Sequence, residues 1–290
     1  MVDLPEELLS CPACNSIQVY EVVTRAAVTT LRCNLCALEF AFLEDAPGPD
    51  KAIDTDPDFF HGLTDSFNVQ LAKAHAILPK RLDAYAELLG RPIKSVLEVG
   101  CATGAYARAF DSLGIRYRAI EIDQEMARQA QTNTGLDIVH GNFMDADESE
   151  SFDLFFCSQV LEHVPKPQSF IDKAARIVGD GIIHVDVPNH SSLASSIRKI
   201  IDAKDYGFIQ PPYHMIAYNK RSLGSLFERS KVDLSILQAY RNDHHIWGQL
   251  VANIGFKNTI QFAVSDFFGR GSLLTAIGRP SACDLVHSNN

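Results

Sequence analysis

The sequence lacks an apolar run long enough to cross a membrane. Its 290 residues are 46% hydrophobic and 21% charged, which is the composition of an ordinary globular protein. No stretch of about 18 consecutive apolar residues occurs, so a membrane-spanning helix is not expected. Residues 1–7 also lack the basic and apolar regions of a secretory signal. These absences predict a cytoplasmic protein that does not associate with membranes.

Basic residues are scarce as well. The chain has 26 Lys and Arg against 36 Asp and Glu, which gives a formal net charge of −10. Residues 1–60 carry most of this excess, with eleven acidic and three basic side chains. A protein that grips the phosphate backbone of a nucleic acid needs a basic surface to displace counterions. The charge distribution therefore disfavours nucleic acid as a partner.

Four of the seven cysteines follow a pattern. They form two C-x-x-C pairs separated by eighteen residues: Cys11, Cys14, Cys33 and Cys36. Two residues between paired cysteines allow both thiolates to reach one tetrahedral ion, and the β-rich runs 17–23 and 28–32 predict a hairpin that joins the pairs. Disulfides are not expected without an export signal. We therefore predict a zinc ribbon over residues 1–43, in which four protein ligands make the metal structural.

The segment after the ribbon is acidic and contains proline. We interpret residues 44–58 as a linker to a second domain that spans residues 59–290. Over residues 59–92 apolar side chains recur at helical spacing, which predicts one or two helices ahead of a sheet. The sequence leaves three roles for the ribbon open: docking on the second domain, substrate capture and a dimer contact.

Residues 95–107 have the pattern of a strand, a glycine-containing turn and a helix. The glycines of the turn let backbone approach a ligand closely. About twenty residues later a second strand ends in Glu121, which can accept hydrogen bonds from both hydroxyls of a ribose. Dinucleotide-binding proteins need G-x-G-x-x-G here, so that pyrophosphate can sit at the helix N-terminus. Glu98 would instead repel a pyrophosphate, but it can hold a cationic amino group.

Four stretches in this order resemble motifs of the class I S-adenosylmethionine-dependent methyltransferases. Residues 98–104 resemble motif I, E/D-x-G-x-G-x-G, and residues 141–144 resemble the loop beside the adenine. Residues 152–164 resemble the fourth-strand motif FDxIxxxxVLEHV, and residues 181–189 the fifth-strand motif GGxLxxxxPN. The resemblance covers about residues 93–240. It implies an α/β fold, with a Rossmann-like seven-stranded sheet and helices on both faces, in addition to the small N-terminal zinc ribbon.

The resemblance also assigns side chains to the binding of S-adenosylmethionine. The implied contacts are Glu98, Gly100, Cys101, Gly104, Glu121, Ile122, Asn142, Phe143 and Ser158. Two positions depart from the family pattern, because Ala102 replaces the usual middle glycine and Asn142 replaces a frequent Asp. Alanine fits if its φ is negative, and the carbonyl oxygen of Asn142 can still contact an adenine amino group. Asp123 is predicted to cap the next helix rather than to bind the cofactor.

The C-terminal third predicts a helix at residues 220–229 and two closing strands at 234–240 and 272–277. Residues 241–271 are too long for a hairpin turn, and we interpret them as a lid or substrate wall, with a homo-oligomer surface as the alternative. The candidate catalytic residues are the preferred general base, two further candidates and a tyrosine that would orient the acceptor: His214, His244, His245 and Tyr213. His163 is interpreted as structural.

These observations predict an S-adenosylmethionine-dependent methyltransferase that acts on a small acceptor. We expect the methylated group to be a hydroxyl of a sugar or secondary metabolite, for which a general base would be needed. Two alternatives stay open. One is a ribosomal RNA base methyltransferase with an RNA-binding ribbon, which the acidic first sixty residues disfavour. The other is a non-catalytic scaffold that binds a partner protein.

Overall fold

The computed structural model describes residues 10–25, 28–43, 67–192, 209, 214–240 and 271–281. Its strands are β1 (Val19–Arg25), β2 (Val28–Cys33), β3 (Glu39–Leu43), β4 (Ser95–Val99), β5 (Arg116–Glu121), β6 (Ile138–His140), β7 (Leu154–Ser158), β8 (Ile182–Pro188), β9 (Ile216–Ala217), β10 (Val232–Tyr240) and β11 (Leu273–Pro280). Its helices are α3 (Phe67–Leu89), α4 (Ala105–Ser112), α5 (Gln124–Thr134), α6 (Pro167–Val178) and α8 (Lys220–Arg229), with the 3-10 turns η2 (Phe143–Asp145) and η3 (Leu161–His163). None of these helices has the length and apolarity that a membrane crossing requires.

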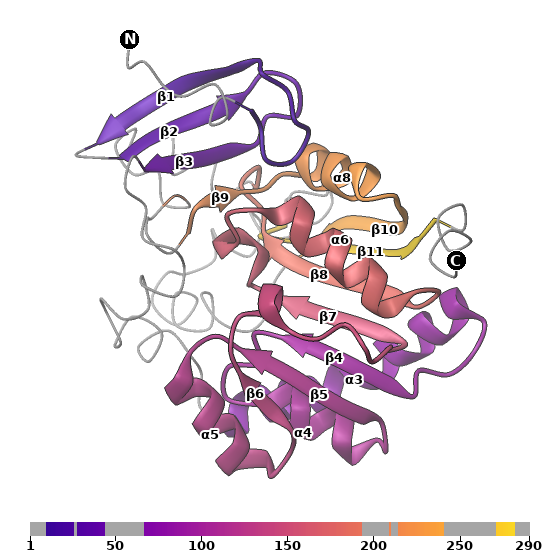
Figure 1. Cartoon of the computed structure of the whole chain (residues 1–290). Coiled ribbons are helices and arrows are strands. Elements are labelled where there is room, and N and C mark those ends of the chain that lie inside the picture. The colour runs from indigo at the N-terminus through magenta and orange to yellow at the C-terminus, as the bar shows by residue number, and fades with distance from the viewer. Residues whose placement is uncertain are drawn as a thin grey trace, which may run out of the picture.

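The larger sheet has seven strands in the order β10-β11-β8-β7-β4-β5-β6 (Figure 1). The five strands from β8 to β6 are parallel, and β11 and β10 close the sheet antiparallel to their neighbours. After β4 the chain forms β5 and β6 on one side of that strand, and it then crosses to the other side of β4 to form β7. In such open sheets ligands bind at the carboxyl ends of the strands where the order reverses. The predicted fold class and the two closing strands are confirmed.

Helices cover both faces of this sheet, as predicted. Helices α3, α4 and α5 pack on one face, where Leu154 and Phe156 of β7 belong to the core. Helices α6 and α8 pack on the other face, where the intervening Phe155 and Cys157 point. Because successive side chains of a strand alternate between faces, a strand buried on both sides is almost continuously apolar. This explains the apolar run in the centre of β7.

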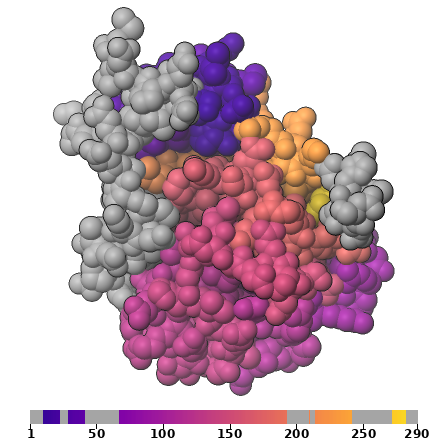
Figure 2. Space-filling view, viewed as in Figure 1, coloured from indigo at the N-terminus to yellow at the C-terminus, as the bar shows by residue number. Residues whose placement is uncertain are grey.

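The predicted ribbon hairpin is also confirmed, since β1 and β2 pair antiparallel. The ribbon sheet continues beyond its own sequence, because β3 pairs with β9 and Phe40 lies opposite Ile216. In the space-filling view the ribbon rests directly on the part of the chain that contains residues 214–240 (Figure 2). The buried core on that side includes ribbon residues such as Leu38 together with side chains of α6 and α8. The ribbon is thus packed into the second domain.

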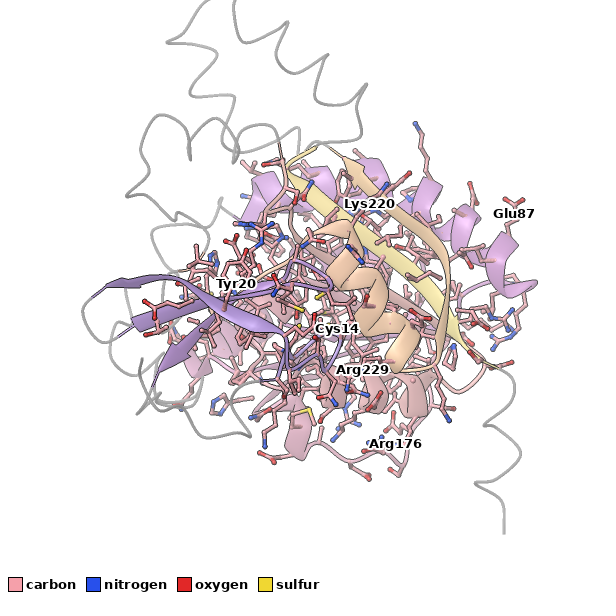
Figure 3. The ribbon with its side chains drawn as sticks, turned by 90° about the horizontal axis from the view of Figure 1, so that it is seen from above. Cys14, Tyr20, Glu87, Arg176, Lys220 and Arg229 are labelled. Carbon is pink, nitrogen blue, oxygen red and sulfur yellow. The ribbon has the colours of Figure 1, made fainter. Side chains whose placement is uncertain are left out.

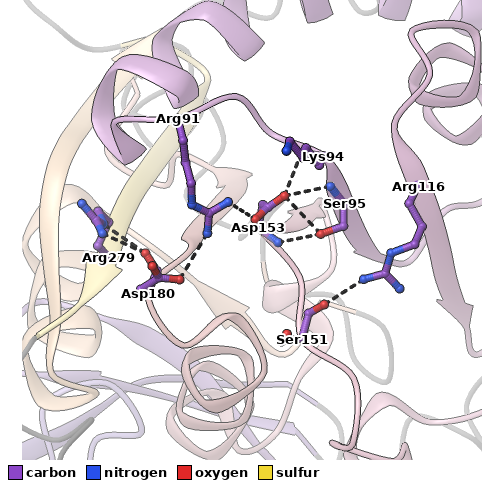
Figure 4. A network of polar contacts seen from close by, with 8 residues as sticks. All are labelled: Arg91, Lys94, Ser95, Arg116, Ser151, Asp153, Asp180 and Arg279. Carbon is purple, nitrogen blue, oxygen red and sulfur yellow. Dashed lines mark hydrogen bonds and ion pairs between the residues drawn. The ribbon is translucent and has the colours of Figure 1, made fainter.

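A polar network joins the amino ends of β4 and β7, opposite the ligand-binding edge (Figure 4). One carboxylate oxygen of Asp153 accepts hydrogen bonds from the backbone N–H of Lys94, at 2.7 Å, and of Ser95, at 3.0 Å. Arg91 pairs with Asp153 and with Asp180. Burial alone would raise the pKa of Asp153, but the bonds from Arg91 and the backbone lower it. This network fixes the two central strands relative to each other.

Several expectations fall outside the described residues. They include the whole of the predicted linker at 44–58, the start of the predicted helical segment at 59–66, and the predicted insertion apart from Gly271. Within the described part of that helical segment, one helix of 23 residues, α3, is found.

Candidate functional site

The turn after β4 is shaped by two glycines in the left-handed region. Gly100 has φ of 78° and Gly104 has φ of 83°, a conformation that side chains rarely adopt. A Cβ on Gly100 would lie 2.3 Å from Cγ2 of Val160, in the loop after β7. A Cβ on Gly104 would lie 2.9 Å from Cγ2 of Thr134, on α5. The glycines therefore let two neighbouring segments close tightly around the turn.

Ala102 contradicts the expectation of a negative φ, since its φ is 47°. A non-glycine residue in the left-handed region is strained by about 1–2 kcal/mol. The backbone N–H of Ala102 donates a 2.9 Å hydrogen bond to Oε2 of Glu121. This bond to the end of the neighbouring strand helps to hold the strained residue, so the position keeps the conformation that a glycine would take.

Two buried carboxyl groups flank the glycine turn. Glu98, near the end of β4, is 3% exposed, and Glu121, at the end of β5, is 6% exposed. Burial raises the pKa of Glu98 to about 8, despite a hydrogen bond from the hydroxyl of Tyr117, and the charge of Glu121 adds to the shift. Burial also raises the pKa of Glu121, against bonds from the backbone N–H groups of Asp123 and Ala102. Such a pair favours a ligand that brings positive charge and hydrogen-bond donors.

The neighbouring residues of the predicted cofactor site lie around the same edge. Asp123 caps α5, accepting a 2.7 Å bond from the N–H of Met126, which confirms its predicted role. Asn142 uses its side-chain oxygen to cap η2, where it accepts a 2.9 Å bond from the N–H of Met144. Phe143 and Cys101 are buried, and burial raises the pKa of the Cys101 thiol. Ile122 and Ser158 are half-buried at the ends of their strands.

A buried polar network lies beside this edge, on β8, and the sequence pattern did not point to it. Asp186 accepts a 2.6 Å hydrogen bond from the hydroxyl of Thr275, lies 3.0 Å from Nε2 of His184, and forms an ion pair with Arg81 of α3 at 3.5 Å. The hydroxyl of Tyr85, also on α3, is 2.9 Å from Nδ1 of His184. Burial would raise the pKa of Asp186, but His184 and Arg81 lower it to about 2. The network anchors α3 to the sheet.

His214, the preferred catalytic candidate, lies just before β9. Its ring packs against the ring of His163, with the two centroids 4.8 Å apart, and burial lowers its pKa. Glu162 is adjacent and buried, and burial raises its pKa to about 8. The sequence pattern placed Glu162 and His163 in a family motif without assigning a function to Glu162. The other catalytic candidates, Tyr213, His244 and His245, lie outside the described residues.

The four ribbon cysteines converge as predicted. All four Sγ atoms lie within 4.8 Å of one another, and the Cys11–Cys36 and Cys14–Cys33 pairs are 3.5 Å apart. A tetrahedral ion bound at about 2.3 Å from each sulfur needs edges of about 3.8 Å. The backbone N–H groups of Leu35 and Cys36 point to Sγ of Cys33, at 3.3 and 3.5 Å, and would stabilise its thiolate. The donor set therefore fits a tetrahedral zinc ion.

The cysteine cluster lies against α8. The side-chain amide of Asn219 donates to the carbonyl oxygens of Cys36, at 3.2 Å, and Ala37, at 2.8 Å, while its oxygen caps α8. At the other end of the helix Arg229 donates to the carbonyl oxygen of Ala13, at 3.1 Å. Figure 3 shows Cys14 beside the helix that begins at Lys220 and ends at Arg229. Both knuckles of the ribbon are thus tied to the second domain.

Comparison with known proteins agrees with this geometry. A family model described as "Methyltransferase domain" matches residues 97–184. Ubiquinone biosynthesis O-methyltransferase of Xanthomonas campestris pv. campestris (strain B100) is 32% identical over 114 residues, covering 37% of this chain and 48% of the relative. The enzyme of the same name from Hahella chejuensis has the same identity and coverage. The chain thus spans about half the length of the curated relatives it matches.

Solved structures show the same fold at low sequence identity. Magnesium protoporphyrin IX methyltransferase of Synechocystis PCC 6803, with bound SAH, has a TM-score of 0.53 at 12% identity, covering 80% of this chain and 98% of the other. A chain from the complex between the Haloferax volcanii Trm112 methyltransferase activator and a methyltransferase has a TM-score of 0.51 at 16% identity, covering 76% and 99%. The chain therefore has the Rossmann-like fold of these methyltransferase structures; residues 97–184 match the methyltransferase-domain model, and a ribbon with a cysteine cluster packs on the C-terminal part of the chain.

Proposed function

We propose that this protein transfers a methyl group from S-adenosylmethionine to a hydroxyl of a small acceptor, such as a sugar or a secondary metabolite. The observation that carries the proposal is the pair of buried carboxyl groups, Glu98 and Glu121, on either side of the turn at Gly100. A buried carboxylate is costly unless it is paired or hydrogen-bonded. A ligand with ribose hydroxyls and a cationic amino group would supply both kinds of partner.

The residues around the turn would each have a defined part in binding. Glu121, at the end of β5, would accept hydrogen bonds from the two ribose hydroxyls. Glu98, at the turn, would face the amino group of the methionine moiety. Phe143 and the backbone of η2 would border the adenine, together with Asn142, whose amide group stays available while its oxygen caps η2. Ser158 and Ile122 would line the remaining strand ends.

Methyl transfer to oxygen depends mainly on alignment. When bound, S-adenosylmethionine would supply the methyl group: its bond to sulfur would break to give a neutral thioether as the bond to the acceptor oxygen forms, and the hydroxyl proton would pass to a basic side chain or to water. Alignment can contribute on the order of 7–11 kcal/mol, so the task of the protein is to hold the acceptor at the carboxyl edge. His214 lies there, in the segment before β9, and is the described residue we propose to activate the hydroxyl. Tyr213, His244 and His245 remain candidates for the rest of the acceptor site.

The preference for oxygen in a small molecule is supported by the names of the relatives. The matched curated proteins are called ubiquinone biosynthesis O-methyltransferases. The acidic charge of residues 1–60 supports a small acceptor over RNA. We further propose that Cys11, Cys14, Cys33 and Cys36 hold a structural zinc ion, because their sulfur atoms are arranged for tetrahedral coordination.

Titration calorimetry of the full chain with SAH, the demethylated product, tests the cofactor assignment. We expect saturable binding that Glu121→Ala weakens about tenfold or more, because a charge-assisted hydrogen bond contributes roughly 1.5–3 kcal/mol. Glu87→Gln, an exposed change on α3, is the matched control and should bind like the unchanged chain. Absence of binding at millimolar SAH would favour the scaffold alternative. If the protein methylated ribosomal RNA and bound RNA in a salt-sensitive way, the RNA methyltransferase alternative would replace the proposal of a small acceptor.

A further inference from the structure

Glu162, His163 and His214 form a second cluster of potential metal ligands, separate from the cysteines. Their ligand atoms all lie within 4.8 Å of one another. Nε2 of His163 is 3.9 Å from Oε1 of Glu162. We propose that these three side chains bind a divalent transition-metal ion that holds the oxygen atoms of the acceptor. The proposal of a metal site depends only on the geometry of these three residues. The proposal that the metal binds the acceptor rests, in addition, on the proposed methyl transfer.

The surroundings of Glu162 call for a cation. Its side chain is 2% exposed, and its Oε2 is buried without a hydrogen-bond partner. Among the described residues no Lys or Arg forms an ion pair with it; the imidazoles of His163 and His214 lie beside it, and the negative charge of Asp186 makes an unpaired carboxylate here less favourable still. A buried carboxyl oxygen without a hydrogen-bond partner is unfavourable in either protonation state, and a protonated carboxyl would give up its proton to the solvent when a metal ion binds. A metal ion beside the two imidazoles would satisfy that oxygen.

The donor set and spacing suit a transition metal. Zinc is bound at about 2.0–2.2 Å by imidazole nitrogen and carboxylate oxygen, so neighbouring ligand atoms lie about 3–3.5 Å apart. Metal binding would therefore require the side chains to rotate and bring these atoms closer than the observed limit of 4.8 Å. Two imidazoles with one carboxylate favour zinc, iron or manganese over magnesium. Three protein ligands leave coordination positions open, which distinguishes this site from the closed cysteine site.

The cluster lies next to the cofactor turn. Val160, which packs on Gly100, comes two residues before Glu162. The backbone N–H of Met215 donates to the carbonyl oxygen of Glu162 at 3.0 Å, and the N–H of Ala41 donates to the carbonyl oxygen of Met215 at 2.8 Å. The ribbon strand β3 therefore fixes the segment that carries His214 against the loop that carries Glu162. The ribbon thereby acquires a role in assembling the acceptor site.

This placement indicates the class of acceptor. A cation with open positions favours a hydroxyl that has a second oxygen donor on the adjacent carbon, as in a vicinal diol or a catechol. Coordination lowers the pKa of a bound hydroxyl, so the acceptor would lose its proton to water before methyl transfer and would need no protein base. In this arrangement the ring nitrogen of His214 binds the ion and does not accept the proton. His214 would then activate the acceptor as a ligand.

Manganese binding to the full chain loaded with a single equivalent of zinc, which the four thiolates take up in preference, tests the site. Mn²⁺ prefers oxygen and nitrogen donors to thiolates, so it leaves the cysteine cluster occupied by zinc. The loss of the electron paramagnetic resonance signal of free Mn²⁺ measures binding directly, without an activity assay. We expect one saturable site, weakened about tenfold or more by Glu162→Gln and by His214→Ala. His75→Gln, a histidine on the exposed side of α3, is the matched control and should leave Mn²⁺ binding unchanged.

The outcomes separate this site from the cofactor assignment. SAH calorimetry on the same variants verifies that each one is folded and still binds cofactor. Lack of saturable Mn²⁺ binding by a chain that binds SAH would overturn the metal site and leave the proposed methyl transfer intact. Equal Mn²⁺ binding by the unchanged chain and both cluster variants would overturn it as well. Methylation of a catechol that a chelator abolishes and Mn²⁺ restores would support the acceptor class, whereas chelator-insensitive methylation would return His214 to the role of base.

Discussion

The hydroxyl of Tyr117 donates a 2.5 Å hydrogen bond to Oε2 of Glu98, and both groups are buried between β4 and β5. The tyrosine hydroxyl can donate this bond whether Glu98 is neutral or ionised, so it holds the carboxyl in place at the cofactor turn in both states. Because burial raises the pKa of Glu98 to about 8, the carboxyl is mostly protonated near neutral pH before a ligand binds. Its charge state should therefore change when a cation arrives.

Cofactor binding is expected to release a proton from Glu98. A cationic amino group favours the carboxylate, so binding lowers the pKa of Glu98 and expels its proton. Affinity for SAH should rise with pH by up to about tenfold per unit between about pH 6 and pH 7.5, which is below the pKa of an α-amino group. Calorimetry in buffers of different ionisation enthalpy measures the release, which should approach one proton at the acidic end.

Glu98→Gln separates this linkage from other titrations. The amide cannot ionise, so both the proton release and the pH dependence of affinity should disappear, with weaker binding at pH 7.5. Glu87→Gln, the same substitution at an exposed position of α3, is the matched control and should leave the proton release unchanged. An unchanged proton release in Glu98→Gln would show that another group, such as Glu121, titrates on binding.

Ala102→Gly is expected to stabilise the protein. The left-handed φ of 47° strains alanine by about 1–2 kcal/mol, while glycine adds roughly 0.4–1 kcal/mol of entropy to the unfolded chain. The net gain should be about 0.5–1 kcal/mol in the free energy of urea unfolding, with SAH affinity kept or improved. Ala76→Gly, at an exposed position in α3, should lose about 1 kcal/mol instead. Destabilisation by both substitutions would mean that the strain at Ala102 is not relieved by glycine.

Loss of the ribbon metal is expected to loosen the second domain. Cys36→Ser removes one sulfur ligand, and the carbonyl of Cys36 accepts a bond from Asn219 at the start of α8. Hydrogen exchange should therefore accelerate in β9 and the first turn of α8 as well as in the ribbon. Leu35→Ser, at a half-exposed position of the same knuckle, is the control and should change little. Faster exchange confined to residues 10–43 would show that the ribbon folds independently of the domain.

The sequence was informative wherever local chemistry decides the structure. The spacing of Cys11 and Cys14, the glycines of the cofactor turn and the cap at Asp123 each follow from short-range rules, and the structure confirms the elements they predicted. The order of family-like motifs implied the seven-stranded sheet, and the helix predicted at residues 220–229 is found as α8. These features need few residues and no knowledge of distant partners.

Other features depend on contacts that a linear pattern does not contain. The φ of Ala102 is set partly by its bond to Glu121, nineteen positions away in the chain. The pairing of β3 with β9 joins segments that are more than 170 residues apart, and it brings His214 beside Glu162. The sequence gives no sign that Glu162 is buried or that His214 lies beside it and His163. Both facts follow only from the three-dimensional structure. The same holds for Asp186, whose partners come from α3, β8 and β11.

Asp186 should make the protein sensitive to acid. Its folded pKa of about 2 lies below the model-peptide value of 3.8, so the stability it contributes is present above pH 3.8 and is lost as the pH falls toward 2. Asp186→Asn should lower the free energy of urea unfolding by about 2–3 kcal/mol at pH 7, and the deficit should shrink steadily below about pH 5. Asp83→Asn, on the exposed side of α3, should show neither effect. A deficit that stays constant with pH would mean that Asp186 acts mainly through its hydrogen bond from Thr275, and that its ion pair with Arg81 contributes little.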